Sequence, residues 1–325
     1  MRLHTAKLAK FMGRHDSFIL TTHDPADADG LGAELVFARI LHEKGKKFRI
    51  INASAIPSHF RFMDPKGIVE QWDKKHSRLI KKSALILLDT ADESTTGSMR
   101  ESIPESKEIF VIDHHEPKSH TAFTGIADSS AASTSELAVM LAESLGVTLD
   151  PQTAFTAYIG IAYDTGFFAY SKTGPRTFRA ALALHKLGVN PTEVYRRLNE
   201  NASVEALLLQ KRALAGMELH CSNKVAVQVL RLQDFAEAGA KQEETEGFVS
   251  FPLRAKDITV SLLLKEMPDG KVRCSLRSKG TVNVAKIAQE LKGGGHTNAA
   301  GFTSEWDIDR TLEILMKKIA GLLKK

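Results

Sequence analysis

The sequence predicts an α/β fold in which a parallel β-sheet carries helices on both faces. Short apolar runs bounded by polar loops, such as 84–89 and 109–113, are typical of strands buried in a parallel sheet. Helical patterns alternate with these runs up to about residue 190, as expected for β-α-β units. A second series of strands follows, and it predicts a smaller α/β domain.

The elements of the first domain can be assigned from these patterns. The expected strands are 17–22, 47–52, 84–89 and 109–113, and the expected helices are 30–44, 134–145, 152–162 and 175–187. We expect residues 1–189 to form this domain.

The remaining sequence predicts a connector and a second domain. Asn190-Pro191-Thr192-Glu193 has the pattern of a helix start, so residues 190–222 are expected to form a helical connector. Residues 223–325 would form the second domain. Its expected strands are 224–231, 257–265 and 271–277, and its expected helices are 282–291 and 307–323.

Composition and charge limit the class of protein. With 325 residues and 43% hydrophobic content, the chain can bury two domain cores. It has no apolar stretch of about 18 residues and no signal-peptide core, so we expect a cytoplasmic protein. Cys221 and Cys274 do not have the spacing of a disulfide framework or a zinc site. The net charge of +5 is compatible with an anionic partner, but it is too small to predict binding of long duplexes.

Carboxylates and imidazoles follow three of the apolar runs. His23, Asp27 and Asp29 follow the first, Asp89 follows the third, and Asp113-His114-His115 ends the fourth. Ligands of open α/β sheets bind outside the carboxyl ends of the strands. Three strands would therefore bring more oxygen and nitrogen ligands to one edge than a single metal needs, which predicts a two-metal site.

Each of these signals has another interpretation when it is taken alone. The loop after His23 could be a strand-to-helix turn capped by an aspartate, and Asp89 could be a helix cap. Adjacent histidines on an extended segment point to opposite sides, so one of His114 and His115 could bind metal while the other faces substrate. Asp164 ends a helical pattern, where the helix dipole disfavours a carboxylate, so a nearby cation is expected. Their combination favours the metal site.

These motifs resemble those of the DHH phosphoesterase family. The matching positions are His23, Asp27, Asp29 and Gly32 for the first motif, Asp89 for the second, Asp113-His114-His115 for the third and Asp164-Thr165-Gly166 for the fourth. The C-terminal part resembles the associated DHHA1 domain through Ser275-Leu276-Arg277-Ser278, Asn283, Gly293-Gly294-Gly295-His296 and Asn298-Ala299-Ala300-Gly301.

The resemblance implies a site with two Mn²⁺ ions, or with Mg²⁺, and the histidines favour Mn²⁺. One ion would be held by His23, Asp27 and Asp89, and the other by Asp29, Asp89, His114 and Asp164. Asp89 would bridge the two ions, and Asp113 would orient a ligand. His115 is expected to bind a phosphate oxygen during catalysis.

The second domain is expected to bind nucleotides. Consecutive glycines expose backbone N–H groups to an anion, and an arginine can bind phosphate through two hydrogen bonds. A triple glycine after a helix is also a common helix C-terminus. The expected substrate-binding residues are His115, Arg277, Ser278, Gly293, Gly294, Gly295, His296 and Asn298.

The two-domain length resembles that of the family's nanoRNase type. That type hydrolyses short oligoribonucleotides to mononucleotides and dephosphorylates 3′-phosphoadenosine 5′-phosphate. The alternatives are a phosphodiesterase of linear or cyclic dinucleotides, such as pApA or pGpG, and a catalytically silent nucleotide sensor. A RecJ-like exonuclease is less favoured because no single-strand-binding domain is apparent. The expected partners are short oligoribonucleotides and nucleotides, with no membrane, and a homodimer is compatible with the sequence.

Overall fold

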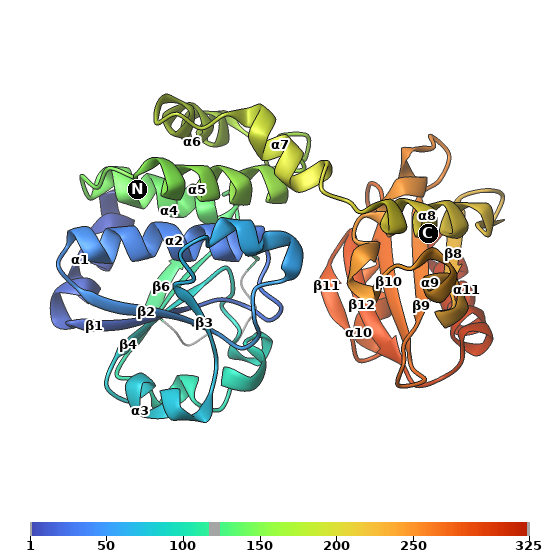
Figure 1. Ribbon diagram of the computed structural model, residues 1–325, viewed down its shortest axis with the longest axis horizontal. Helices are drawn as coiled ribbons and strands as arrows, with labels where there is room; N and C mark the ends of the chain where they lie inside the picture. The colour runs from blue at the N-terminus through green and yellow to red at the C-terminus, as the bar shows by residue number, and fades with distance from the viewer. Residues whose placement is uncertain (1, 117–123, 324–325) are drawn as a thin grey trace. The chain divides into compact units, whose positions relative to one another are not determined.

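The structure is a computed structural model that describes residues 2–116 and 124–323. The chain forms two compact units, Met1–Asn201 and Ala202–Lys325, which Figure 1 shows in blue to yellow-green and in yellow to red. Within the described residues, no helix is both long and apolar enough to cross a membrane.

The first unit is built on sheet A, whose six strands follow the order β3-β2-β1-β4-β5-β6, with every neighbouring pair parallel. The strands are β1 (Ser17–Thr21), β2 (Lys47–Asn52), β3 (Val69–Gln71), β4 (Ala84–Leu88), β5 (Ile109–Asp113) and β6 (Thr124–Ala127). The helices are α1 (Arg2–Arg14), α2 (Ala28–Glu43), α3 (Ser77–Ile80), α4 (Thr134–Ser144), α5 (Pro151–Asp164), α6 (Pro175–Lys186) and α7 (Pro191–Asn199). The predicted parallel α/β sheet is confirmed.

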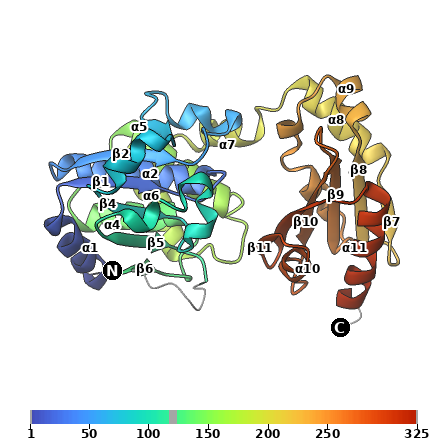
Figure 2. The same cartoon turned by 90° about the horizontal axis from the view of Figure 1, so that it is seen from below.

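Both faces of sheet A are buried, which explains why its central strands are continuously apolar. On one face α2 and α4 pack on the strands, and α5 packs against both helices. Figure 1 shows α2 and α5 on this side of the sheet and α3 on the other. The second face is covered by shorter segments, including α3 and the 3₁₀ turns that contribute Met99 and Ile103. Figure 2 shows α1 beside β6 at the sheet edge.

The strand order determines where a site can form. β1, β4 and β5 are neighbours and run in the same direction, so the loops that follow them leave from one edge of the sheet. α2 starts at this edge, after the loop that follows β1. The side chains after these three strands are therefore brought together by the topology.

The second unit is built on sheet B, whose strands follow the order β11-β12-β10-β9-β8-β7. Only β8 and β9 pair in parallel within the described residues. The strands are β7 (Glu218–His220), β8 (Val225–Leu230), β9 (Val260–Glu266), β10 (Val272–Ser278), β11 (Gly294–His296) and β12 (Ala299–Ser304). The helices are α8 (Val204–Ala215), α9 (Leu232–Ala238), α10 (Ala285–Glu290) and α11 (Ile308–Leu323).

Each face of sheet B has its own core. α10 and α11 contribute apolar side chains to one cluster, and α8 and α9 contribute to another. The stretch 190–222, which the sequence suggests as a helical connector, contains α7 of the first unit together with α8 and β7 of the second.

Candidate metal centre

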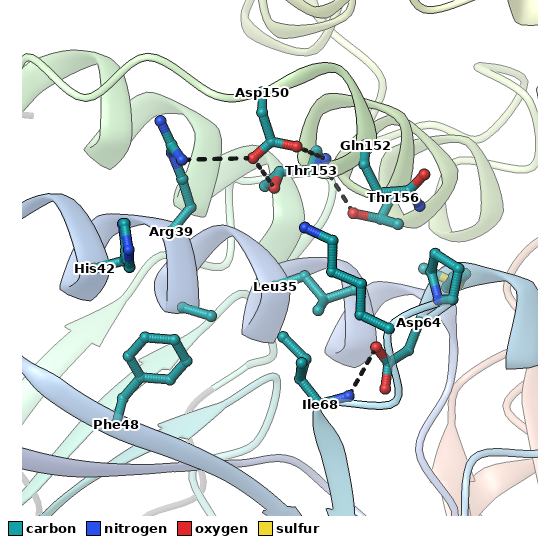
Figure 3. Close-up of a pocket in the computed structure, with 14 residues that line it drawn as sticks. Leu35, Arg39, His42, Phe48, Asp64, Ile68, Asp150, Gln152, Thr153 and Thr156 are labelled. Atoms are coloured by element: carbon teal, nitrogen blue, oxygen red, sulfur yellow. Dashed lines mark hydrogen bonds and ion pairs between the residues drawn. The ribbon is translucent and has the colours of Figure 1, made fainter.

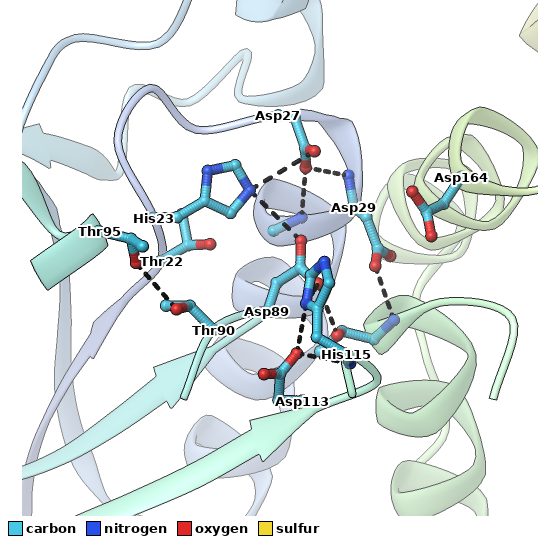
Figure 4. Close-up of polar contacts among 12 residues, drawn as sticks. Thr22, His23, Asp27, Asp29, Asp89, Thr90, Thr95, Asp113, His115 and Asp164 are labelled. Carbon is cyan, nitrogen blue, oxygen red and sulfur yellow. Dashed lines mark hydrogen bonds and ion pairs between the residues drawn. The ribbon is translucent and has the colours of Figure 1, made fainter. Parts of the chain in front are cut away.

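Asp89 lies at the centre of the site. It directly follows β4, is 2% exposed, and has a backbone φ of 59°, in the left-handed region that aspartate tolerates better than most residues. The hydroxyl of Thr134 donates to Asp89 Oδ1 at 2.8 Å. The carboxylate is therefore held at the edge of the sheet, and Figure 4 shows the surrounding side chains converging on it.

The first ligand group consists of His23, Asp27 and Asp89. His23 Nε2 lies 3.5 Å from Asp27 Oδ2 and 3.5 Å from Asp89 Oδ2. Asp27 is the N-cap of α2, and its Oδ1 accepts hydrogen bonds from the N–H groups of Asp29 and Gly30. One ligand atom from each of the three residues lies within 4.8 Å of the others. This spacing is small enough for one ion to contact all three.

The second ligand group consists of Asp29, His114 and Asp164. Asp29 is fully buried and accepts hydrogen bonds from the N–H groups of Thr134 and Ser135 at the start of α4. His114 Nε2 lies 3.2 Å from Asp164 Oδ2, 3.9 Å from Asp29 Oδ2 and 3.5 Å from Asp89 Oδ1. Asp89 therefore lies within reach of both groups. Asp164 comes from the last residue of α5.

The four aspartates create an unfavourable concentration of negative charge. Burial and the charge of Asp27 raise the pKa of Asp29 to about 6. Burial and the charge of Asp29 raise the pKa of Asp89 well above its ordinary value, and the same two causes raise the pKa of Asp164. Buried carboxylates in this arrangement need a compensating cation in order to ionise together.

The two histidines in these groups have opposite shifts. Burial and the charges of His115 and Lys172 lower the pKa of His114 to about 3, so its imidazole is neutral and can bind metal. Burial disfavours the charged form of His23, but hydrogen bonds to Asp27 and Asp89 raise its pKa to about 11. A cation bound between these carboxylates would displace that proton.

His115 differs from the sequence expectation in one respect. The two histidines were expected to point to opposite sides, yet their ring centroids are 4.5 Å apart, and His115 Nδ1 lies 3.7 Å from Asp89 Oδ1. The strand ends at Asp113, so the alternation of an extended segment no longer applies to these residues. Asp113 Oδ1 accepts from His115 N and lies 2.6 Å from His115 Nδ1. Asp113 therefore orients His115.

This donor set fits divalent cations. It contains only carboxylate oxygens and imidazole nitrogens, which suit Mn²⁺ or Mg²⁺. Asp89, His114 and His115 form a further possible group, so His115 could also approach an ion. The first unit thus brings all the sequence-predicted metal residues together.

The residues of the second unit that were predicted to bind substrate make hydrogen bonds within that unit. The Ser278 hydroxyl donates to the carbonyl of Val282, and the Asn298 amide donates to Ser278 Oγ and to the carbonyl of Gly280. These two side chains brace the turn after β10. Arg277 lies on β10, where its Nη1 donates to the carbonyl of Leu276.

The three glycines were expected to form a binding loop, but Gly294–His296 pair with β12 as the short strand β11. A Cβ at Gly293 would lie 2.2 Å from the carbonyl oxygen of Gly301, and one at Gly295 would lie 2.3 Å from that of Ala299. Close packing therefore requires both glycines, whereas a Cβ at Gly294 would meet open space. The side chain of His296 lies outside the described part of the chain.

Three contacts around the candidate site were not predicted from the sequence. The N–H groups of Thr134 and Ser135 hold Asp29, the hydroxyl of Thr134 holds Asp89, and the amino group of Lys172 donates to the carbonyl of His114 at 3.4 Å. The helix itself was expected at 134–145, and the pattern Ser133-x-x-Glu136 agrees with this start, but neither indicates that its first turn would contact Asp29 and Asp89. No comparable signal marks Lys172.

A separate pocket of about 290 Å³ lies in the first unit (Figure 3). It is formed by α2, β2, the segment 63–68 and the start of α5, and none of the metal-site residues lines it. Arg39 in this pocket pairs with Glu43 and lies 3.9 Å from Asp150. The pocket is therefore distinct from the metal centre.

Two family models match the chain. Residues 17–161 match the N-terminal domain of the DHH family, and residues 222–324 match the DHHA1 domain. The chain belongs to the DHH family. This membership identifies it as a metal-dependent phosphoesterase, and the aspartate and histidine cluster supplies groups that can bind the metal.

Relatives extend over most of the chain. It is 29% identical to the bifunctional oligoribonuclease and PAP phosphatase NrnA of Thermus thermophilus, a match that covers 92% of this chain and 88% of the relative. It is 26% identical to the cyclic-di-AMP phosphodiesterase GdpP of Bacillus subtilis, with 98% of this chain matched to 50% of the relative. The chain therefore spans about half the length of that second relative.

A solved structure shares the fold. The exopolyphosphatase-related protein from Bacteroides fragilis superposes with a TM-score of 0.93 at 24% identity, and the match covers 100% of this chain and 98% of the other. At this level of identity the likeness concerns the fold alone.

Proposed function

We propose that this chain is a manganese-dependent phosphoesterase that hydrolyses short oligoribonucleotides to mononucleotides and removes a phosphate from 3′-phosphoadenosine 5′-phosphate. The observation that carries the proposal is the position of Asp89 within reach of two ligand groups. Similarity to the oligoribonuclease and PAP phosphatase of Thermus thermophilus over most of both chains supports the choice of substrates.

The ligand assignment follows from these two groups. His23, Asp27 and Asp89 would hold one ion, and Asp29, Asp89, His114 and Asp164 would hold the other. Imidazole ligands in an oxygen-rich set favour Mn²⁺ over Mg²⁺. Two such ions, when bound, lower the pKa of a water molecule and offset negative charge on the phosphoryl group.

The side chains around the ligands have supporting roles. Asp113 fixes the ring of His115, and in this proposal that ring contacts a phosphate oxygen of the substrate. The start of α4 fixes Asp29 through two N–H groups, which favour its ionised form. In the second unit, Arg277 would bind a phosphate of the nucleotide away from the reacting bond.

A dinucleotide phosphodiesterase is the second candidate, because nearly the whole of this chain matches about half of the cyclic-di-AMP phosphodiesterase of Bacillus subtilis. The experiment that separates the candidates is incubation with Mn²⁺ and each of four substrate types. These are labelled RNAs of two to 24 nucleotides, 3′-phosphoadenosine 5′-phosphate, linear pApA and cyclic di-AMP.

We expect the protein to cleave the shortest RNAs and to release phosphate from 3′-phosphoadenosine 5′-phosphate. Turnover of pApA or cyclic di-AMP alone would favour the second candidate. An absence of any hydrolysis with Mn²⁺ would contradict both candidates.

A further inference from the structure

The segment Thr165–Gly174, which we call the post-α5 turn, begins directly after the metal-site residue Asp164. Three consecutive residues in it, Gly166, Phe167 and Phe168, have φ values of 54°, 56° and 66°. Left-handed backbone is costly for phenylalanine, so it persists only where the surroundings enforce it, and such residues cluster at functional sites.

Aromatic packing enforces this conformation. The ring of Phe167 lies 5.2 Å from that of Tyr195 on α7, and the ring of Phe168 lies 5.6 Å from that of Phe178 on α6. The N–H group of Tyr170 donates to the carbonyl of Thr165 at 2.9 Å, which closes the turn. The turn is thus held against α6 and α7 by these ring contacts.

The turn brings a positive charge to the metal centre. The amino group of Lys172 donates to the carbonyl of His114 at 3.4 Å, and His114 Nε2 lies 3.2 Å from Asp164 Oδ2. Lys172 therefore lies beside the second ligand group. An ammonium in such a position can offset the charge that a phosphoryl group develops in its transition state.

The turn also presents an exposed aromatic ring. Tyr170 is 63% exposed, and its ring lies against Gly166 so closely that a Cβ there would be 2.5 Å from it. The Cα of Gly166 is at most about 7.6 Å from that of Asp164, because consecutive Cα atoms are 3.80 Å apart. One part of the ring is thus supported by backbone while the rest is open to solvent, as in a base-stacking platform.

We propose that the post-α5 turn is a nucleotide-recognition element of the first unit, and this inference rests on the proposed function. Lys172 contacts a non-bridging oxygen of the phosphoryl group under attack. Tyr170 stacks on the base of the adjoining nucleoside. The chain would then hold the reacting nucleotide with residues of the catalytic unit itself, independently of Arg277.

The role of Lys172 is tested with Lys172→Met, Lys172→Arg and the wild type on the dinucleotide pApA with Mn²⁺. We expect Lys172→Met to lower kcat by about 10²-fold, as for loss of a transition-state donor, and Lys172→Arg to recover part of it. Lys82→Met changes an exposed lysine at the opposite end of β4 and should match the wild type. Metal content and melting temperature should be unchanged in all of them.

The role of Tyr170 is tested with Tyr170→Ala and Tyr170→Phe on pApA and on an analogue that lacks the base next to the scissile phosphate. Loss of one stacked base corresponds to an increase in KM of about 5- to 150-fold for Tyr170→Ala on pApA. Tyr170→Phe keeps a stacking surface and should keep the wild-type KM. All three proteins should have similar KM values for the analogue.

The outcomes separate this inference from the proposed function. If the wild type hydrolyses pApA as well as the other short RNAs, and both sets of variants match it, the inference is wrong while the proposed function stands. If Lys172→Met loses activity together with bound metal, Lys172 supports His114 and does not contact the phosphoryl group. If the wild type hydrolyses none of the phosphoesters, the proposed function fails and this inference fails with it.

Discussion

Asp89 is the residue on which the two-metal assignment depends. One of its oxygens faces His23 and the other faces His114, so its carboxylate is the group that would link the two proposed ions. We expect Asp89→Ala to lower kcat by about 10³-fold or more, since metal ions supply several kcal/mol of charge stabilisation. Steady-state kinetics at saturating Mn²⁺ checks this, and near-normal turnover by the variant would exclude a bridging role.

Glu34 is a buried carboxyl that lies outside the metal ligands. Its Oε2 accepts from Asn52 at 3.0 Å, and its Oε1 has no hydrogen-bond partner within the described residues. Burial raises the pKa of Glu34 to about 8, although Asn52 and the charge of His23 favour ionisation; the charge of Asp64 adds to the increase. The folded protein therefore keeps this proton at a pH where the unfolded chain has lost it.

This difference makes Glu34 destabilising as the pH rises. Between the ordinary pKa of 4.5 and about 8, the folded state binds more protons than the unfolded state, so stability falls across this range. The loss amounts to at most about 5 kcal/mol. We expect Glu34→Gln to reduce the loss of unfolding free energy between pH 5 and pH 8, as measured by urea unfolding of the Mn²⁺-loaded protein at both pH values. Glu43→Gln, an exposed change on the same helix, should leave it unaltered.

At the scale of elements, the start of α4 supports the metal site without supplying a ligand. The Thr134 hydroxyl donates to Asp89 at 2.8 Å, while two backbone N–H groups of this turn donate to Asp29. Loss of a hydrogen bond to a metal ligand typically costs 10- to 100-fold in affinity. We expect Thr134→Val to weaken Mn²⁺ binding by about tenfold, as measured by calorimetric titration.

Thr153→Val is the matched control for that change. Thr153 Oγ1 donates to Asp150 at 2.7 Å at the start of α5, so the variant removes the same kind of hydrogen bond at another helix start. Unchanged Mn²⁺ affinity in both variants would show that the position of Asp89 does not depend on α4.

The sequence predicts some elements better than others, for physical reasons. The central strands were predicted within one or two residues because burial on both faces makes them continuously apolar. The edge strand β3 was missed because its three residues make no apolar run. α1 was missed although Leu8, Phe11 and Met12 follow helical spacing and are buried. The pairing of β11 with β12 depends on contacts across the sheet that no local pattern encodes.

Within the site, ligand types and strand ends were predictable, whereas directions of side chains were not. His23, Asp89 and His114 converge because neighbouring parallel strands end at one edge. The orientation of His115 depends on where β5 stops and on its contact with Asp113, which the sequence alone does not determine.

At the scale of the whole molecule, metal binding should couple the site to stability. In the metal-free protein the pKa values of Asp29, Asp89 and Asp164 are raised, so these groups hold protons that a cation must displace. The folded metal-free state also loses stability as the pH rises through these raised values. Metal binding should therefore stabilise the protein more at higher pH.

This coupling can be measured by thermal unfolding with excess Mn²⁺ and with EDTA, at pH 5.5 and at pH 8. We expect the increase in Tm caused by Mn²⁺ to be larger at pH 8. The Asp89→Ala variant should show a smaller increase at both pH values. An increase that is equal at both pH values, or larger at pH 5.5, would contradict the protonation of these aspartates in the metal-free protein.

The second unit is expected to contribute to substrate binding without taking part in the chemical step. All the metal-site residues belong to the first unit, whereas Arg277 lies on β10 of the second. The hydrolysis of a substrate that needs only the metals should not depend on Arg277, whereas the hydrolysis of a nucleotide should. We therefore expect Arg277→Ala to raise KM by about 10- to 100-fold for dinucleotides and for 3′-phosphoadenosine 5′-phosphate, as for loss of a charged hydrogen bond.

Hydrolysis of bis-nitrophenyl phosphate, a small activated diester, should stay within about twofold of wild type in the same variant, because that compound presents no nucleotide phosphate for Arg277 to bind. Arg273→Ala is a suitable control, since Arg273 lies on the same strand and its Nη1 donates to Thr303 at 3.1 Å. A parallel loss of both activities in Arg277→Ala would assign Arg277 to the chemical step.

The length of the RNA substrate is the last property to test. The net charge of +5 gives little reason to expect an extended basic surface that would bind a long strand, so the wild type should cleave a trimer faster than a 24-mer. Equal cleavage of a 24-mer and a trimer by the wild type would contradict the preference for short substrates.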